Sequence, residues 1–443
     1  MAENASLITR LPPEILALIF ANLSLQHRVQ CLCICRSWRA FLFSWSGLWN
    51  ELSDNEGYDM IKMFKAYMQS SSSGTPMRYR IDSIHIHATR RRKHKQIMRL
   101  FKEYQSHCRI QSVHLYGNMS RHWFRRMIRL EDMVRLTLNG VSNPAPDKVF
   151  AIVLHECPNL KHFVYHTAWS AHAPASPSSS FNWSFPPHHK LLSLDMYLHA
   201  RVDSFPLHRL LSSLPHLVAI RLNPYDFDGA AHVLHMLQQH PFLQAIRFNY
   251  HDNDVDEEQQ LRGKRGGGGG LRQLQIQELC GIDDTALIPF LIQHHTTLRI
   301  LDIHFVEYLT HLTASALASL SFSVLERISL SNLVGAHPSH LMAFFARATR
   351  LRQVRIFALD AFNDNVLYTL GQYASRLESL YLAHCENITP KGLLQFATTA
   401  KCKSTTLALC QVDHDMMDNT STSYDNDNVL DAIRQALPQL VSM

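Results

Sequence analysis

Leu325-Glu326-Arg327-Ile328-Ser329-Leu330 is followed 26 residues later by Leu351-Arg352-Gln353-Val354-Arg355-Ile356 and, after another 26, by Leu377-Glu378-Ser379-Leu380-Tyr381-Leu382. Each segment has apolar residues at its first, fourth and sixth positions. The fourth and sixth positions alternate with more polar residues, as in a half-buried strand. The pattern occurs thirteen times between residues 81 and 409, and its middle position returns most often after 26 or 27 residues. A fixed period of this length indicates a repeat protein in which each repeat adds one strand to a parallel sheet.

The segments between these strands carry helix signals. Residues 341–345 have apolar side chains at i, i+3 and i+4, and residues 366–370 have them at i, i+1 and i+4. Residues 389–390 are a capping threonine followed by proline. This combination resembles leucine-rich repeats over residues 78–415, and residues 377–394 resemble the cysteine-containing subtype. The resemblance implies a curved solenoid with a parallel sheet on its concave face and mostly helices on its convex face.

A different pattern occupies the first fifty residues. Leu11-Pro12-Pro13-Glu14-Ile15-Leu16 opens a short run that is apolar almost all round, Cys35-Arg36-Ser37-Trp38-Arg39 lies in the next run, and Leu48-Trp49 ends the block. About forty residues cannot bury this much apolar surface alone, so the block must share it with another chain or with the domain that follows. Residues 8–52 resemble the F-box, which implies a three-helix module that binds a Skp-type adaptor and, through it, a cullin and a RING subunit.

The same resemblance implies which residues contact the adaptor. They are Leu11, Pro12, Glu14, Ile15, Leu16, Ile19, Cys35, Trp38 and Trp49. The alternative is that these residues form only the core of a small helical domain. Residues 25–28 replace an acidic cap that is common in the family, which predicts a weaker second helix. A metal site at Cys31, Cys33 and Cys35 is not expected, because helix residues two apart point about 200° from one another.

The predicted fold class is α/β, a small N-terminal three-helix F-box followed by a curved leucine-rich-repeat solenoid. The predicted parts, in chain order, are a tail at 1–10, the F-box at 8–52, a partly helical linker at 53–77, about thirteen repeats at 78–415, and an acidic segment with a capping helix at 416–443. Two turns lack a helix pattern. Residues 168–188 are rich in Ser, Pro and His, and residues 251–270 run from acidic to glycine-rich, so both are predicted to be irregular arms.

Composition excludes several classes of protein. The 443 residues are 46% hydrophobic and 18% charged, no stretch approaches 18 consecutive apolar residues, and the nine cysteines form no C-x-x-C pair. We therefore expect a soluble protein of the cytoplasm, the nucleus or both, without a disulfide framework. The sequence contains no nucleophile elbow, zinc-protease motif or nucleotide-binding fingerprint, so we expect neither enzyme activity of its own nor a cofactor.

The net charge of +6 is distributed unevenly. Residues 78–129 contain 14 Lys or Arg against two acidic residues, a net charge of +12, which implies an anionic neighbour. Within this block, Arg90 to Lys95 resembles a nuclear-localisation signal or the polar face of the first convex helix. RNA or anionic membrane binding by the block is an open alternative, although the sequence shows no stacking motif or groove-reading element.

The residues between the apolar positions of each strand are predicted to line the concave face. There the N-terminal repeats place His85, His87, His114 and Tyr116, and later repeats place arginines. The predicted target-binding residues are Arg221, Asn223, Arg247, Asn249, Gln275, Asp302, His304, Arg327 and Arg355. Arginines suit carboxylates and phosphates, so the target segment is predicted to be acidic or phosphorylated. The alternative is that these are solvated strand residues without a ligand.

Together the two resemblances imply a non-catalytic substrate-recognition subunit of a ubiquitin ligase. The F-box would bind the adaptor, and the repeats would bind a target for ubiquitination and proteasomal degradation. The alternative is a scaffold or adaptor that acts independently of degradation.

Overall fold

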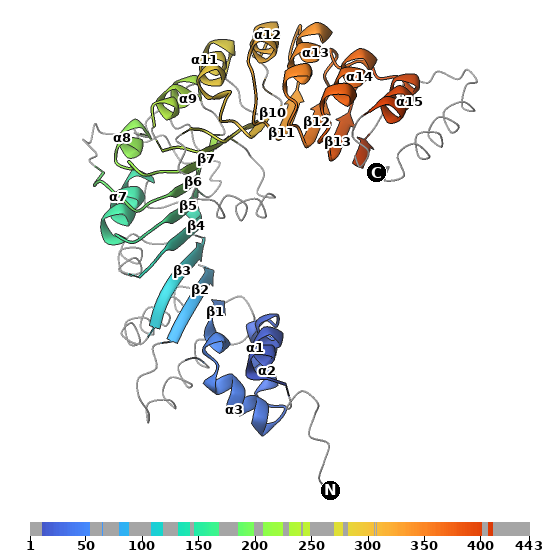
Figure 1. The fold of residues 1–443 in the computed structure, drawn as a ribbon. Coiled ribbons are helices and arrows are strands. Elements are labelled where there is room, and N and C mark those ends of the chain that lie inside the picture. The colour runs from blue at the N-terminus through green and yellow to red at the C-terminus, as the bar shows by residue number, and fades with distance from the viewer. Residues whose placement is uncertain are drawn as a thin grey trace, which may run out of the picture. The chain divides into compact units, whose positions relative to one another are not determined.

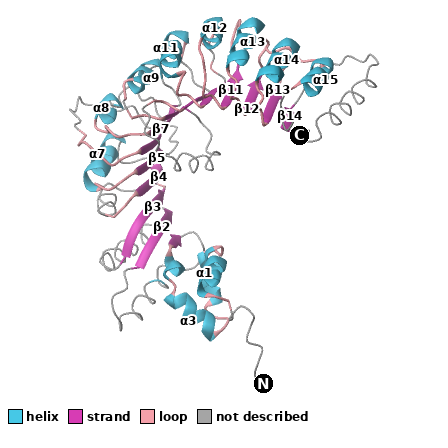
Figure 2. Ribbon diagram, in the orientation of Figure 1, coloured by secondary structure: helices cyan, strands magenta, loops and turns pink. Residues whose placement is uncertain are grey.

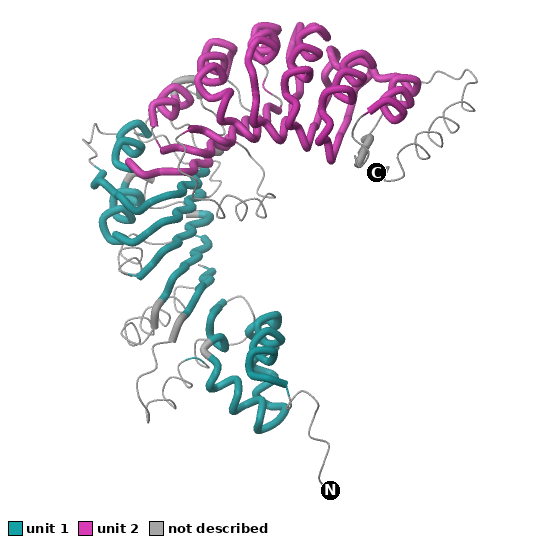
Figure 3. The backbone as a smooth tube through the Cα atoms, viewed as in Figure 1, with its two compact units in different colours: residues 1–199, 205–214 teal, residues 200–204, 215–443 magenta. Residues whose placement is uncertain are grey.

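The computed structural model divides the chain into two compact units, one of residues 1–199 and 205–214 and one of residues 200–204 and 215–443 (Figure 3). We call them unit 1 and unit 2 and describe each by itself. The residues that the structure describes are 11–53, 64, 79–87, 108–117, 132–141, 146–167, 185–198, 207–224, 230–240, 242–248, 270–277, 282–304, 306, 308–400 and 406–410.

Unit 1 begins with three short helices, α1 (Pro13–Ala21), α2 (Leu25–Cys31) and α3 (Arg36–Ser44), followed by the 3-10 turn η2 (Ser46–Trp49). The prolines at the start of α1 remove no helix hydrogen bond, because first-turn N–H groups have no partner within the helix. Ser24 caps α2 by accepting a hydrogen bond from the His27 N–H at 3.4 Å. Helix α2 is therefore formed and capped without the acidic residue whose absence predicted a weaker helix.

Arg28 is a buried arginine that connects α2 to η2. Its exposed fraction is 3%, its Nε donates to the Leu23 carbonyl at 2.8 Å, and its guanidinium donates to the Gly47 carbonyl at 2.9 Å and to Asn50 Oδ1 at 2.5 Å. The guanidinium also lies 5.8 Å from the centre of the Trp45 ring. Backbone carbonyls and an aromatic face thus compensate for the buried charge.

Six parallel strands follow these helices in unit 1. They are β1 (Glu51–Ser53), β2 (Tyr79–His87), β3 (Cys108–Tyr116), β4 (Arg135–Val141), β5 (His162–Thr167) and β6 (Ser193–Leu198). Each pairs with the next in chain order, and α7 (Pro146–Glu156) and α8 (Leu207–Ser212) lie on one side of the strands (Figure 2). Strand β1 was not predicted, because three residues are too short for a repeat pattern.

Unit 2 contains eight more parallel strands in chain order. They are β7 (Ala219–Pro224), β8 (Ala245–Phe248), β9 (Gln273–Gln277), β10 (Ile300–His304), β11 (Arg327–Ser331), β12 (Gln353–Phe357), β13 (Ser379–Ala383) and β14 (Thr406–Cys410). The helices between them cover one face of the strands (Figure 1). They are α9 (Ala230–Gln238), α11 (Asp284–His294), α12 (His311–Ser319), α13 (Pro338–Arg347), α14 (Asp364–Tyr373) and α15 (Pro390–Thr399).

The strand register confirms the predicted repeat in both units. In unit 1 the aligned middle positions are Leu52, Ile84, Val113, Leu136, Phe163 and Leu194. In unit 2 they are Ile220, Ile246, Leu274, Leu301, Ile328, Val354, Leu380 and Leu407. Except for Leu407, whose burial is not described, these side chains are buried, so this apolar row is part of the core of each unit.

Neighbouring helices of unit 2 are linked at their N-termini. The Asp284 carboxylate, in the first turn of α11, accepts hydrogen bonds from the Thr310 N–H at 3.1 Å, the Thr310 hydroxyl at 2.6 Å and the Thr313 N–H at 3.2 Å. The Asp364 carboxylate likewise accepts hydrogen bonds from the Thr389 N–H at 2.8 Å and from the Thr389 hydroxyl at 2.6 Å. A carboxylate from one repeat thus satisfies N–H groups at the start of the next repeat's helix.

Several predicted parts lie outside the described residues. These are the tail 1–10, the run 90–95, the arms at 168–184 and 251–269, and the segment 411–443. Of the helices that the structure describes, none is long and apolar enough to cross a membrane.

Candidate functional site

Helix α1 has one buried and one exposed apolar side. Leu16 and Phe20 are buried, whereas Ile15, Leu18 and Ile19 are 42%, 62% and 42% exposed. The exposed three stand at i, i+3 and i+4 and therefore share one side of the helix, which we call the α1 face. Contiguous apolar residues on a surface mark a binding site more often than scattered ones do.

Aromatic packing beneath the α1 face holds the helix in place. The Phe20 ring lies 5.3 Å from the Trp38 ring in a T-shaped contact and 5.7 Å from the Phe41 ring in a stacked one. Trp38 comes from α3, whose first residues are capped by Cys35, because Sγ accepts a hydrogen bond from the Trp38 N–H at 3.4 Å. The α1 face is thus on a helix whose opposite side packs against aromatic rings of α3.

The structure divides the predicted adaptor-binding residues by exposure. Pro12, Glu14, Ile15 and Ile19 are exposed, Leu11, Cys35 and Trp38 are half-buried, and Leu16 and Trp49 are buried. The Trp49 ring packs against Phe64 at 5.3 Å, inside unit 1. Sequence reasoning left Leu18 out of the set, although its spacing of three from Ile15 was a usable signal.

In each unit, the side chains that alternate with the core positions form what we call the polar face of the strands. In unit 1 its two aligned rows are His85, His114, Thr137, Val164 and Asp195, and His87, Tyr116, Asn139, His166 and Tyr197. All ten side chains are half-buried, so part of each reaches solvent. This face is rich in aromatic rings with polar atoms.

Four of these rings form a stacked group on β2 and β3, which we call the ring block. His85 stacks on His114 with ring centres 4.3 Å apart and planes at 2°, and His87 stacks on Tyr116 at 4.5 Å and 6°. Burial lowers the pKa of His114 to about 4, with further lowering by His85 and Arg135. Burial also lowers the pKa of His85, and the opposing effect of Glu51 is smaller. His114 is therefore neutral at pH 7.

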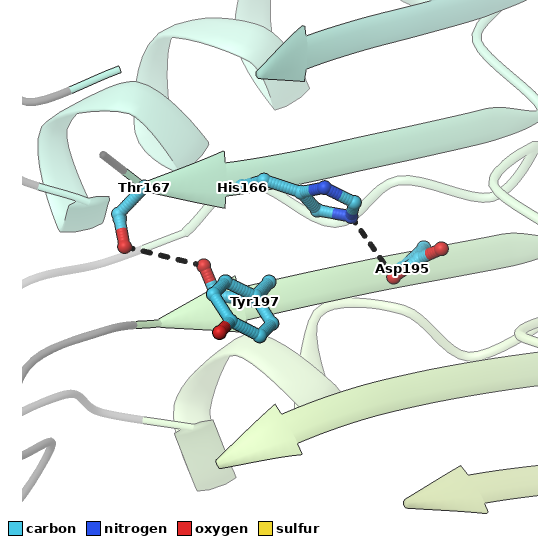
Figure 4. A network of polar contacts seen from close by, with 4 residues as sticks. All are labelled: His166, Thr167, Asp195 and Tyr197. Carbon is cyan, nitrogen blue, oxygen red and sulfur yellow. Dashed lines mark hydrogen bonds and ion pairs between the residues drawn. The ribbon is translucent and has the colours of Figure 1, made fainter. Parts of the chain in front are cut away.

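A second polar group lies on β5 and β6 of the same face. His166 Nε2 is 3.4 Å from Asp195 Oδ1, and the Thr167 hydroxyl donates to the Tyr197 carbonyl at 3.4 Å (Figure 4). The His166 and Asp195 side chains are each 16% exposed. The 3.4 Å separation is long for a hydrogen bond but within the range of an ion pair.

The polar face of unit 2 differs because its central side chains are buried. Arg247 is 5% exposed and donates to Gln273 Oε1 at 3.2 Å, and Gln273 and Gln275 are each 1% exposed. Arg247 and Gln275 were predicted to contact the target. Both are buried in this structure, so a target could contact them only after neighbouring side chains move, and their role in target binding stays a prediction.

Asp302 and His304 were also predicted to contact the target, and they too are buried. His304 Nε2 lies 2.8 Å from Asp302 Oδ1 and contacts the Ser329 hydroxyl as well, while the His304 ring meets Phe357 at 4.6 Å. A catalytic triad needs the acid and the serine on opposite ring nitrogens. Here both partners share Nε2, so the cluster is a buried polar network and does not relay a proton to Ser329.

The remaining predicted residues of unit 2 are placed as follows. Arg355 is exposed, and Arg221 and Arg327 are half-buried. The Asn223 side chain and Asn249 lie outside the described residues. Arg221 is directly opposite Arg247 in the register, as predicted, but the burial of Arg247 prevents the two from forming an open guanidinium patch.

In the part of the chain that the structure describes, no group of three or more His, Cys, Asp or Glu side chains could hold a metal ion. Cys35 instead serves as a helix cap, and Cys31 is half-buried with its pKa raised by burial. These thiols are accounted for by local packing and capping.

Comparison with known proteins matches residues 8–55 to the F-box-like family. The comparison with curated proteins finds no match. Similar solved structures include an internalin from Listeria monocytogenes, at 13% identity and a TM-score of 0.42, covering 77% of this chain and 87% of that one. A chain of the Rad7 and Elc1 complex from yeast has 14% identity and a TM-score of 0.37, covering 82% and 68%. A leucine-rich-repeat protein of Leptospira interrogans has 12% identity and a TM-score of 0.29, covering 79% and 91%.

Structural similarities at this level of identity and TM-score support no inference about function. The assignment of repeats depends instead on the register of this chain's own strands. The family match covers the three helices, the 3-10 turn and β1, which is the part that the L-P-x-E-I start and the C-R-x-W-R centre indicate. Residues 8–55 are therefore an F-box-like domain, and the repeats of both units have the α/β architecture of leucine-rich-repeat proteins.

Proposed function

We propose that this protein is a non-catalytic substrate-recognition subunit of a cullin-RING ubiquitin ligase. Its F-box-like domain binds a Skp-type adaptor through the α1 face, and its repeats bind the target protein. The exposed side chains of Ile15, Leu18 and Ile19, within a domain of this family, are the observation that carries the proposal.

The α1 face has the properties of an interface core. Full burial of one such side chain contributes about 1.5–3 kcal/mol. Ile15, Leu18 and Ile19 have 42–62% of their surface left to bury, so each would add part of that amount to the free energy of binding. Glu14 is exposed beside it and provides a polar margin, and the exposed Pro12 adds apolar surface. The half-buried Leu11 and Trp38 extend the apolar area.

In this role the protein contributes proximity. It holds lysines of the target near a ubiquitin carrier that its partners supply, and no side chain of its own takes part in bond formation. The complex acts in the cytoplasm, the nucleus or both, and its target is ubiquitinated for proteasomal degradation. The half-life of captured targets after loss of the protein tests degradation, because a scaffold would leave it unchanged.

Adaptor binding is tested by charge substitution on the α1 face. We expect Ile15→Asp with Ile19→Asp, and separately Leu18→Asp, to weaken adaptor binding more than about tenfold, because each buries a carboxylate in an apolar interface. The measurement is co-purification, followed by titration with purified adaptor.

Matched controls come from unit 2. Ile292 on α11 and Leu312 on α12 are 53% and 52% exposed, so Ile292→Asp and Leu312→Asp introduce the same charge on comparably exposed helices. Unchanged adaptor binding in these controls, with loss in the α1 variants, supports the proposal. Normal binding by the α1 variants would contradict it.

A further inference from the structure

The ring block of His85, His87, His114 and Tyr116 combines stacked rings with polar ring edges. Each ring stacks on a ring of the neighbouring strand, and the register places Thr137 and Asn139 of β4 beside His114 and Tyr116. Strand side chains stand roughly perpendicular to the sheet, so parallel rings stacked along the strand order direct their edges outward. Those edges carry the imidazole nitrogens and the phenol hydroxyl.

Two of these edges have unused hydrogen-bonding capacity. Within the described residues, no hydrogen bond or ion pair engages the side chains of His114, Tyr116 or Arg135, and all three are half-buried. Burial raises the pKa of the Tyr116 hydroxyl, which therefore stays protonated and can donate. A neutral His114 has one N–H to donate.

Charge around the ring block favours an anion. Arg135 is close enough to lower the pKa of His114, and in the register it lies directly beside Ser112, two residues before His114 on β3. Acidic groups also lie near the block: Asp82 is on β2, and Glu51 is 3.7 Å from His85 Nε2 with a side chain that is 54% exposed. Strands β2 and β3 also lie within residues 78–129, whose net charge is +12. An arginine with adjacent N–H and O–H donors suits a carboxylate.

We propose that the ring block and Arg135 together bind an extended, carboxylate-rich peptide segment of the target protein. This rests on the proposed function, in which the repeats recognise the target, and it assigns recognition to unit 1. Arg135 pairs with a carboxylate, while the His114 N–H and the Tyr116 hydroxyl donate to further peptide oxygens. Single-stranded nucleic acid binds by stacking bases on open ring faces, whereas this block presents edges.

The experiment uses the full chain in complex with its adaptor. The probe is a fluorescein-labelled peptide of alternating Glu and Gly, compared with the Lys and Gly counterpart and with oligouridine, by fluorescence anisotropy. We expect the Glu peptide to bind and its affinity to fall with salt. His114→Phe with Tyr116→Phe keeps both rings but removes the donors, and it should weaken binding roughly tenfold or more. Arg135→Gln should weaken it similarly and flatten the salt dependence.

The matched control is His155→Phe with Tyr373→Phe, on the exposed sides of α7 and α14, which should bind the Glu peptide normally. Adaptor binding is measured on every sample, so loss of peptide binding with the adaptor retained reports on the ring block and not on the F-box-like domain. Three results would overturn the proposal: no binding of the Glu peptide by an adaptor-bound chain, unchanged binding by the Phe variants, or a preference for oligouridine. None of these results concerns adaptor binding, so they are distinguishable from a failure of the F-box-like domain to bind its adaptor, which would count against the proposed function.

Discussion

The polar faces of the two units follow one rule of alternation and yet have different properties. In unit 1 the ring block leaves His114 and Tyr116 half-buried, without hydrogen bonds among the described residues. In unit 2 the buried Arg247 bonds to Gln273, and His304 contacts Asp302 and Ser329. Strand register decides which side chains share a face, but their burial and mutual bonding decide whether that face is available to a ligand.

The largest effect is expected from breaking the buried network of unit 2. His304→Ala removes the imidazole that contacts Asp302, Ser329 and Phe357. The variant leaves buried polar atoms without a partner and a cavity, so it should lower the free energy of unfolding by about 3 kcal/mol. The measurement is urea denaturation followed by circular dichroism. Wild-type stability in this variant would mean that the network contributes nothing and that the two faces are not distinct.

An intermediate effect is expected at Asp284, which joins α11 to α12. Burial alone would raise the pKa of its carboxyl, but the hydrogen bonds from Thr310 and Thr313 outweigh burial and lower the pKa. The stabilisation is therefore complete above the pKa of the unfolded chain, about 4, and is lost as pH falls through the lower folded pKa.

Asp284→Asn should accordingly cost about 2 kcal/mol at pH 7, since the amide replaces a charged acceptor of several hydrogen bonds. The difference from wild type should shrink as pH falls below about 4, because protonation removes the same charge from wild type. Denaturation midpoints of wild type and variant at a series of pH values measure the cost at pH 7 and the change in that cost with pH. A constant difference at all pH values would exclude the carboxylate as the stabilising group.

The smallest effect on stability is expected in unit 1. His114→Gln exchanges a half-buried, unbonded side chain for another polar one and should change the free energy of unfolding by less than about 1 kcal/mol. Its denaturation curve, recorded beside that of His304→Ala, compares the two faces directly. If His114→Gln were as destabilising as His304→Ala, the polar face of unit 1 would be structural and the comparison would fail.

Repeat spacing predicted the fold closely, because it reports which side chains face the core. The aligned row from Leu274 through Leu301, Ile328 and Val354 to Leu380 reproduces the predicted middle positions. The cap at Thr389 and the proline after it begin α15 as predicted. Local signals of this kind need no knowledge of distant neighbours.

The candidate site was less predictable from sequence. Spacing put His85 and His114 in one row, but charge drew the prediction to the arginines, and the sequence does not report that Arg247 would be buried against Gln273. The missing acidic cap at residues 25–28 predicted a weaker helix, and the sequence does not show that Arg28 bonds to Gly47 and Asn50, about twenty residues away. Burial and long-range hydrogen bonds depend on packing, which one strand or helix does not encode.

The central claim is that the α1 face is where this chain docks on its adaptor. Hydrogen–deuterium exchange of the full chain, with and without the purified adaptor, tests it directly, because docking suppresses local opening of the contacted helix. We predict slower exchange at Pro13–Ala21 in the complex and unchanged exchange in α11 and α12, which carry the control residues Ile292 and Leu312. Protection confined to the repeats, with α1 exchanging as in the free chain, would contradict the claim.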